Sequence, residues 1–137
     1  VGVPVSDEVV AAANRGEEEA VLAWLDSGGR ADATYEIGEE SGLTLLMCAA
    51  NHGHKQLVEL LIRRGAEVDK QSSNGWTALM CAALKGHERV VDLLLRRGAE
   101  FNQQNSSGGT ALMLAVRHGH ERVVELLLRY GAKVDLQ

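Results

Sequence analysis

A repeat period of 33 residues is the feature that most constrains this chain. The motif Gly-x-Thr begins at Gly42, Gly75 and Gly108, so each copy follows the previous one by 33 positions. The dipeptide Gly-His keeps the same step at 53, 86 and 119, and Gly-Ala keeps it at 65, 98 and 131. Periods of about 20–50 residues are typical of stacked repeat arrays. The period therefore predicts a repeat architecture and favours a binding surface over a catalytic pocket.

The composition fits short helices that pack closely. A hydrophobic content of 45% excludes a disordered tail. Only 5 of the 137 residues are aromatic, so Leu, Val and Ala must build the core. No apolar run approaches the ~18–20 residues of a membrane span, and no signal-peptide pattern opens the sequence. We therefore expect no membrane interaction.

The two cysteines, Cys48 and Cys81, occupy equivalent positions one repeat apart. Equivalent points on packed helices lie about 8–10 Å apart, which exceeds the ~7 Å limit between the Cα atoms of a disulfide. We expect free thiols in core or groove positions. Free thiols fit a reducing compartment, and the sequence thus predicts an intracellular protein, cytoplasmic or nuclear.

Charge is distributed unevenly along the chain. Residues 1–41 contain 10 acidic and 2 basic side chains, a net charge of −8, whereas residues 42–137 have a net charge of +3. The acidic excess argues against a phosphate-binding surface at the N-terminal end. It is compatible with a basic partner there, but a solubilising cap of the array is the interpretation we favour.

Residues 75–107 illustrate one repeat unit. Small polar residues precede Gly75 and favour a turn. The hydroxyl of Thr77 can cap a helix that runs from Thr77 to about Lys85, and Gly86 ends that helix. A second helix is predicted from about His87 to Arg97, with a broad apolar face. Helices of about 9–11 residues are marginal alone in water, so they must be stabilised by neighbouring repeats.

The pattern recurs at 42–74 and 108–137 and, in degenerate form, at about 6–37. Four additional residues between Asp32 and Gly42 lengthen the first turn. In the second helix of the degenerate repeat, Trp24 aligns with apolar residues of the later repeats and is predicted to lie in the core. The run Glu17-Glu18-Glu19 begins that helix, where the helix dipole favours negative charge.

The unit resembles the ankyrin repeat over about residues 6–137. The matching residues are Gly75-x-Thr77-Ala78-Leu79-x-x-Ala82-Ala83-x-x-Gly86-His87 and Val90-Val91-x-Leu93-Leu94-x-x-x-Gly98-Ala99. The resemblance implies an all-α fold, an ankyrin-repeat solenoid of stacked helix-turn-helix units with β-turn fingers. It implies one domain over 1–137, alone or within a longer array, with repeats at about 6–37, 42–74, 75–107 and 108–137.

The chain departs from the family in one motif. The Thr-Pro-Leu-His of the family is replaced by Thr-Leu-Leu-Met at 44–47 and by Thr-Ala-Leu-Met at 77–80 and 110–113. The proline is favourable but dispensable. Loss of the histidine removes a side chain that the family commonly uses to connect neighbouring turns. We therefore expect the fold to be retained and the turns to lose some rigidity.

The resemblance further implies a non-catalytic protein–protein interaction module. Family members mostly bind a protein or peptide through the concave face and the fingertips, which here are Glu39–Ser41, Ser72–Asn74 and Asn105–Ser107. Trp76 is the residue we expect to anchor a partner, because an exposed Trp within an apolar patch is a typical hot spot; its ring could instead pack over the next turn. The predicted partner-binding residues are Leu43, Asn51, His52, Trp76, Leu84, Lys85, Arg117 and His118.

Other chemistry finds little support in the sequence. The motif His-Gly-His at 52–54 and 118–120 resembles paired metal ligands, but His54, His87 and His120 share one repeat position, where the family's histidine caps and orients the second helix. The nearby Cys or carboxylate ligands of a zinc site are absent.

Arginines at the ends of the second helices lack interleaved aromatics, which disfavours nucleic acid. No catalytic motif is present, so we expect no enzyme activity, no metal and no cofactor.

Three interpretations of function remain. The first is a binding module, which we expect to be monomeric. The second is a structural spacer within a longer repeat protein, since the apolar residues at 123–127 are not replaced by the polar residues typical of a terminal repeat. The third is an engineered ankyrin binding scaffold, since residues 86–91 and 119–124 are identical. The irregular first repeat argues against full consensus design.

Overall fold

The computed structural model describes residues 3–133, which contain eight helices and one two-stranded hairpin. The last four residues of the fourth predicted repeat and the first two of the predicted domain lie outside this range. In chain order the elements are α1 (Asp7–Asn14), α2 (Glu18–Asp26), β1 (Thr34–Ile37), β2 (Glu40–Thr44), α3 (Leu45–Asn51), α4 (Lys55–Arg63), α5 (Ala78–Lys85), α6 (Glu88–Arg96), α7 (Ala111–Arg117) and α8 (Glu121–Tyr130).

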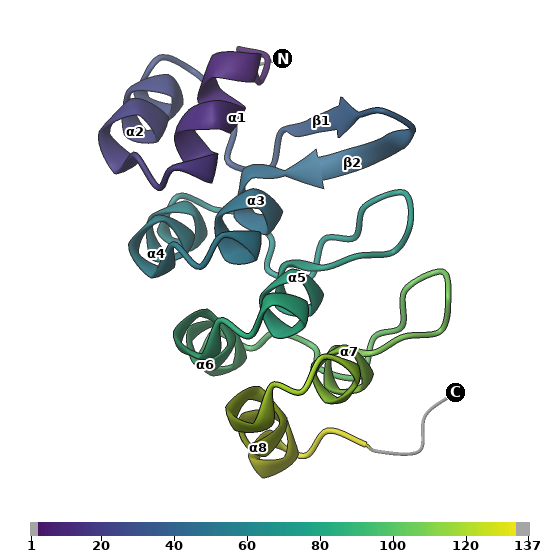
Figure 1. The fold of residues 1–137 in the computed structure, drawn as a ribbon. Helices are drawn as coiled ribbons and strands as arrows, with labels where there is room; N and C mark the ends of the chain where they lie inside the picture. Colours follow the sequence, from purple (N-terminus) through teal and green to yellow (C-terminus); the bar gives the residue numbers. More distant parts are fainter. Residues whose placement is uncertain (1–2, 134–137) are drawn as a thin grey trace.

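The helices form two stacked rows (Figure 1). An inner row contains α1, α3, α5 and α7, and an outer row contains α2, α4, α6 and α8; each helix packs on the next member of its row and on its antiparallel partner. The connections from an outer helix to the next inner helix, residues 27–44, 64–77 and 97–110, project to one side, and we call them the fingers. This arrangement confirms the all-α fold of stacked helix-turn-helix units.

The first finger differs from the others because it forms a β-hairpin. Thr34 pairs with Thr44 and Ile37 with Glu40, with a register shift between them. The two-residue connection begins with Gly38 at φ 61°, and glycine first is one of the favoured arrangements in tight hairpins. The sequence predicts only a longer turn here. The four extra residues lengthen the segments on both sides of the turn, so that these segments pair as β1 and β2.

Each inner helix of the three regular repeats begins at a buried threonine. The hydroxyls of Thr44, Thr77 and Thr110 accept hydrogen bonds from the backbone N–H three residues later, at 3.2 Å in every case. These bonds satisfy one of the donors left unpaired at a helix start. The predicted cap at Thr77 is confirmed. Gly86, which ends the same helix, has φ 76° as expected.

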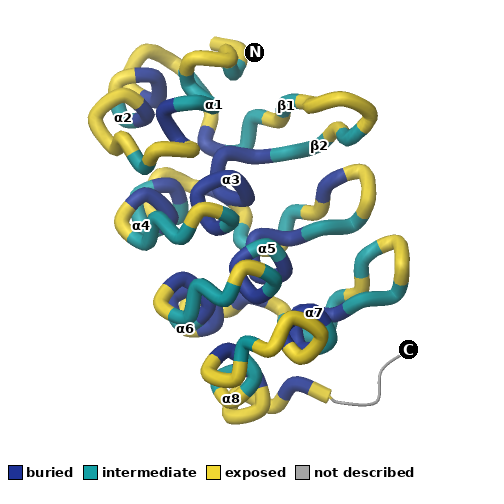
Figure 2. Tube along the Cα trace, viewed as in Figure 1, coloured by how far each residue is buried: buried dark blue, intermediate teal, exposed yellow. Residues whose placement is uncertain are grey.

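The core lies between the two rows and continues from repeat to repeat (Figure 2). It is built from Leu, Val and Ala, as the low aromatic content predicts. Ala50 and Ala83 are fully buried and allow the inner helices to approach closely. Trp24 is 7% exposed, and its indole N–H donates to the carbonyl of Pro4 at 3.1 Å. The prediction that Trp24 belongs to the core is confirmed.

A histidine at the start of each later outer helix connects two repeats. The Nε2 atoms of His54, His87 and His120 lie 2.7, 3.0 and 2.8 Å from carbonyls at the C-terminal ends of α1, α3 and α5. Because a carbonyl only accepts, Nε2 must be the protonated nitrogen. None of these side chains caps its own helix. Each histidine is the N-cap residue of its helix, as expected, but the expectation that its side chain caps that helix is wrong, because the imidazole bonds to the preceding repeat.

The fingers are connected by backbone hydrogen bonds. The N–H of Ser73 donates to the carbonyl of Ser41 at 2.9 Å, and the N–H of Ser106 donates to the carbonyl of Asn74 at 3.0 Å. Met47 and Met80, which replace the family's histidine, are 3% and 1% exposed. These methionines add apolar packing at the finger base, while the main chain supplies polar links between neighbouring turns.

Gly86 and Gly119 form a matched pair for substitution, because an imidazole of the next repeat lies against Gly86 but not against Gly119. Gly86 and Gly119 have φ of 76° and 73°, but a Cβ at Gly86 would lie 2.5 Å from His120 Nδ1, whereas one at Gly119 meets nothing within 4 Å. We expect Gly119→Ala to lower the free energy of unfolding by about 1–2 kcal/mol through backbone strain. We expect Gly86→Ala to lower it by a further ~1–3 kcal/mol because the histidine must move.

Urea unfolding of both variants, followed by circular dichroism, measures this difference. Equal losses in the two variants would contradict a role for the imidazole contact in holding the repeats together.

Candidate functional site

A groove lies on the concave side of the stack, where the first finger faces the inner helices. Its volume is about 320 Å³, and we call it the concave groove. Residues from the first three repeats line it: Val10, Asn14, Tyr35, Ile37, Glu40, Leu43, Met47, Cys48, Asn51, His52, Trp76, Cys81 and Leu84. The structure thus brings together five residues that the sequence predicts for partner binding, namely Leu43, Asn51, His52, Trp76 and Leu84.

Trp76 is positioned by the second finger. Its backbone N–H donates to the hydroxyl of Ser72 at 3.2 Å, and its carbonyl accepts from the N–H of Ser72 at 2.9 Å. The Ser72 hydroxyl in turn donates to a carboxylate oxygen of Glu40 on β2 at 2.7 Å. Trp76 is partly buried, which corrects the exposed rim position predicted from the sequence. The side chain is held in place and still presents a surface to the groove.

Polar side chains of the first two repeats surround the inner wall. The Cys48 thiol donates to the Asn14 side-chain oxygen at 2.6 Å. The Tyr35 hydroxyl donates to the carbonyl of Thr44 at 3.4 Å. His52 Nδ1 lies 3.0 Å from the carbonyl of Cys48, and because a carbonyl only accepts, Nδ1 is the donor. These hydrogen bonds restrain the side chains that form the inner wall of the groove.

The two thiols are free, as the sequence predicts, and they are poor nucleophiles. Burial raises the pKa of Cys48 to about 11. Burial, with the negative charge of Glu40 nearby, raises the pKa of Cys81 to about 12. Because the thiolate is the reactive form, both cysteines contribute packing to the groove wall and not covalent chemistry at neutral pH.

Three predicted residues do not line the groove. Lys85 is exposed at the end of α5, next to Leu84. Arg117 and His118 are exposed on the last repeat. The ring of His118 stacks on that of His120, with 6.3 Å between centroids, and its Nδ1 lies 3.0 Å from the carbonyl of Leu114. These residues lie further along the stack from the first finger.

Four residues of the N-terminal part of the groove are not predicted from the sequence: Val10 and Asn14 on α1, and Tyr35 and Ile37 on the hairpin. Glu40 lies within the predicted fingertip Glu39–Ser41. The degenerate first repeat hides these positions, since its alignment with the others needs an insertion. The Met-Cys pairs at 47–48 and 80–81 are no signal for them, since these pairs belong to the next two repeats and Met80 does not line the groove.

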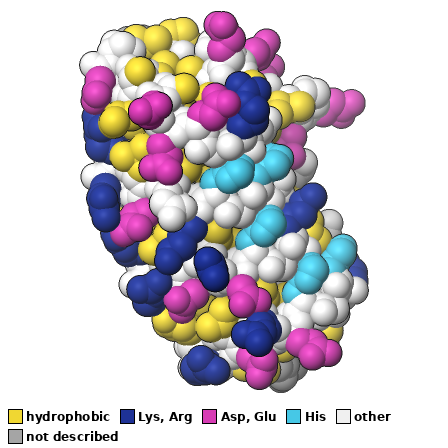
Figure 3. Space-filling view, turned by 60° about the vertical axis from the view of Figure 1, so that its left-hand side comes forward, with side chains coloured by type: hydrophobic (Ala, Val, Ile, Leu, Met, Phe, Trp, Pro, Cys, Tyr) yellow, Lys and Arg dark blue, Asp and Glu magenta, His cyan; other side chains and the backbone are white. Residues whose placement is uncertain are grey.

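The outer helices present a surface of intermixed charges (Figure 3). Arginines there form ion pairs across neighbouring repeats: Arg64 with Asp26 at 2.8 Å, and Arg97 with Glu59 at 3.2 Å. Pairs on such an exposed surface stabilise by only about 0–1 kcal/mol. They place a carboxylate beside each of these arginines, so that this surface carries charge of both signs.

Among residues 3–133, no group of three or more His, Cys, Asp or Glu side chains is placed to hold a metal ion. No helix within this range is long and apolar enough to cross a membrane.

Family models identify the repeats. The model described as ankyrin repeats in three copies matches residues 9–105, and a second, described as ankyrin repeats in many copies, matches residues 85–128. This chain is an ankyrin-repeat protein. Ankyrin repeats generally act as protein–protein interaction modules and are generally non-catalytic. No curated protein matches the ankyrin-repeat chain.

The raised thiol pKa values predict slow alkylation. At pH 8 the thiolate fraction of Cys48, with a pKa of about 11 and not the ordinary 9.0, is lower by about 100-fold, since each pKa unit is a factor of ten. We expect iodoacetamide to modify the folded ankyrin-repeat protein about 100-fold more slowly than the urea-unfolded chain. Mass spectrometry of peptides containing Cys48 and Cys81 measures both rates. Equal rates would contradict the burial of the thiols.

The same values predict a loss of stability in alkali. A thiol whose pKa is higher in the folded state stabilises that state below the unfolded pKa and ceases to do so as pH rises. The free energy of unfolding should therefore fall between pH 9 and about 12. Cys48→Ala and Cys81→Ala should each make the free energy of unfolding fall less steeply as the pH rises. The fall that remains in these variants should reflect Tyr35, whose pKa is also raised by burial.

Proposed function

We propose that this ankyrin-repeat protein binds a protein or peptide segment in the concave groove. The observation that supports this most directly is the convergence of Leu43, Trp76 and Leu84 from two repeats on one hollow. An aromatic ring flanked by aliphatic side chains in a concave site is a typical energetic anchor for a partner. The groove would accept an apolar side chain of the partner beside Trp76.

Polar groups around this anchor would set the orientation of the partner. Asn51 and His52 line the groove at the end of α3, and Glu40 lines it from the hairpin. The amide of Asn51 takes part in no side-chain hydrogen bond among the described residues, so it can both donate and accept. Such groups favour a peptide main chain or polar side chains next to the buried anchor.

Lys85, Arg117 and His118 would extend the site toward the last repeat. All three are exposed and lie at or just past the ends of inner helices. A partner anchored at Trp76 and extended along the inner row would reach them in sequence. Contacts at the rim of an interface mainly tune association rate and specificity, so these residues should matter less for affinity than Trp76.

A structural role within a longer array is the second candidate. Val116 and Leu128 on the last helix pair are 59% and 44% exposed, whereas their counterparts Ala83 and Leu95 in the preceding repeat are 0% and 5% exposed. The last repeat thus presents an apolar face of the kind that packs on a neighbour in this stack. A spacer would tolerate changes in the concave groove without loss of function.

Selection from a displayed peptide library tests the binding role. We expect the unmodified protein to enrich a motif and Trp76→Ala/Leu84→Ser to lose it. For the selected peptide, the double substitution should raise Kd by at least ~30-fold, which is the ~2 kcal/mol of a hot spot. Isothermal titration calorimetry measures Kd for both proteins.

Leu128→Ser/Tyr130→Ala is the matched control, because it removes comparable side chains from α8, away from the groove. It should bind like the unmodified protein. Circular dichroism confirms that all variants are folded. If the groove variant and the control enrich the same peptides, the concave groove is not the site and the spacer role gains support.

A further inference from the structure

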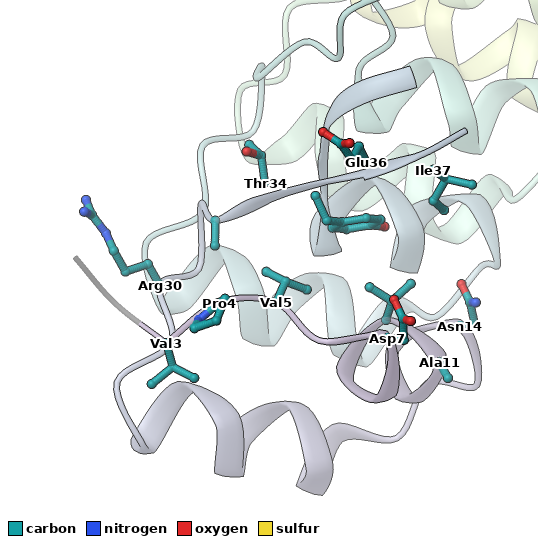
Figure 4. A pocket seen from close by; sticks show the side chains of 13 residues that line it. Val3, Pro4, Val5, Asp7, Ala11, Asn14, Arg30, Thr34, Glu36 and Ile37 are labelled. Atoms are coloured by element: carbon teal, nitrogen blue, oxygen red, sulfur yellow. The ribbon is translucent and has the colours of Figure 1, made fainter. Parts of the chain in front are cut away.

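A second trough lies along the outer side of β1, and we call it the edge trough. Its volume is about 630 Å³. Figure 4 shows β1 on one side of it and the N-terminal segment with α1 on the other. Apolar side chains from both sides line most of it: Val3, Pro4, Val5, Val10, Ala33 and Ile37.

β1 has a free edge in the described residues. It pairs only with β2, and the two form a sheet of two strands. The far side of β2 is occupied, since Ser41 accepts from the N–H of Ser73 and its own N–H donates to the Ser73 hydroxyl at 3.0 Å. The second and third fingers contain no strand. β1 therefore presents an edge along which the backbone of another strand can pair.

Apolar groups are exposed where the trough opens. Ile37 on β1 is 61% exposed, and Val3 on the N-terminal segment is 40% exposed. They are two of the five large hydrophobic side chains that are exposed among the described residues. A partner strand on β1 would cover Ile37 with its own side chains and place alternate side chains over the floor of the trough.

The charge around the trough is negative and unneutralised. Asp7 and Glu36 line it, and neither takes part in an ion pair or side-chain hydrogen bond within residues 3–133. Of the two basic residues in the first 41, Arg15 is bound to Glu17 at 2.7 Å. The other, Arg30, lines one end and extends away from the remaining side chains (Figure 4).

We propose that the edge trough binds an extended segment of a second protein, in which Lys or Arg alternates with small apolar residues, and that this segment adds a strand to β1. A four-residue strand such as β1 pairs with about four residues over roughly 13 Å. The basic side chains would lie on the face of the sheet that carries Glu36 (Figure 4). The apolar side chains would lie on the opposite face, beside Ile37 and Val5.

The charge also selects against other occupants. A second copy that paired its own β1 in the antiparallel register centred on Glu36 would place the two Glu36 carboxylates opposite each other, and like charges on paired strands are destabilising. The open edge beside unpaired carboxylates favours a basic partner over the solubilising cap to which the charge pattern alone points.

The edge trough shares Val10, Asn14, Tyr35 and Ile37 with the concave groove, but it does not contain Trp76 or Leu84.

Calorimetric titration with three synthetic peptides tests the proposal. The first is an acetylated eight-residue peptide of alternating Val and Lys, the second has Glu in place of Lys, and the third is the Val-Lys peptide with all backbone nitrogens methylated. We expect the first to bind at least tenfold more tightly than either of the others. Hydrogen exchange should show new protection of the amides at 34–37 in its presence.

Two charge-matched variants locate the site. Glu36→Lys should weaken binding of the Val-Lys peptide at least tenfold, and Glu19→Lys, an equal change of charge on the exposed face of α2, should weaken it less than threefold. Trp76→Ala/Leu84→Ser should bind this peptide like the unmodified protein. The two sets of variants therefore distinguish a failure of the proposed binding in the concave groove from a failure of the proposed binding in the edge trough.

Three results would overturn the proposal. Equal affinity for the Val-Lys peptide and its methylated form would exclude strand pairing. Loss of binding in Trp76→Ala/Leu84→Ser, with Glu36→Lys unaffected, would place the peptide in the concave groove instead. A dimer in light scattering, with 34–37 protected before any peptide is added, would show that a second copy occupies the edge.

Discussion

The stacking of one repeat on the next is the constraint from which the rest of the structure follows. A pair of short helices cannot bury its apolar face alone, and each pair therefore depends on its neighbours. The imidazole of His87 makes this dependence specific, because it lies over Gly53 and reaches the carbonyl of Asn51. The same contact recurs at both neighbouring junctions, so it fixes how far each repeat is displaced from the one before.

The concave groove is a product of that stacking. Trp76 belongs to the third repeat, Leu43 to the second and Val10 to the first, and no single repeat contains the hollow between them. The Ser72 hydroxyl adds a finer constraint, since it connects the carboxylate of Glu40 with the backbone of Trp76. Ser72 thus orients the anchor although it does not itself line the groove.

Charge gives the two sides of the molecule different properties. On the outer helices, carboxylates of one repeat neutralise arginines of the next, as in the pair of Arg97 with Glu59. At the N-terminal end acidic side chains outnumber basic ones by 10 to 2 over residues 1–41, and Glu36 remains unpaired on an open strand. A surface whose charges are internally satisfied stabilises the stack weakly, whereas unsatisfied charge beside apolar surface is available to a partner.

The sequence by itself predicted the stacked fold, the cap at Thr77, the burial of Trp24 and, for the unit at 75–107, the helix bounds to within a residue. These features depend on the repeat motif, on apolar spacing and on local capping. The helix predicted over Thr77–Lys85 is observed at Ala78–Lys85, and that over His87–Arg97 at Glu88–Arg96. Only the tertiary structure decided that the insertion is a hairpin with a free edge, that Trp76 is partly buried and that the histidines bond to the preceding repeat. Those features arise from contacts between different repeats, and a single unit read along the sequence contains no information about them.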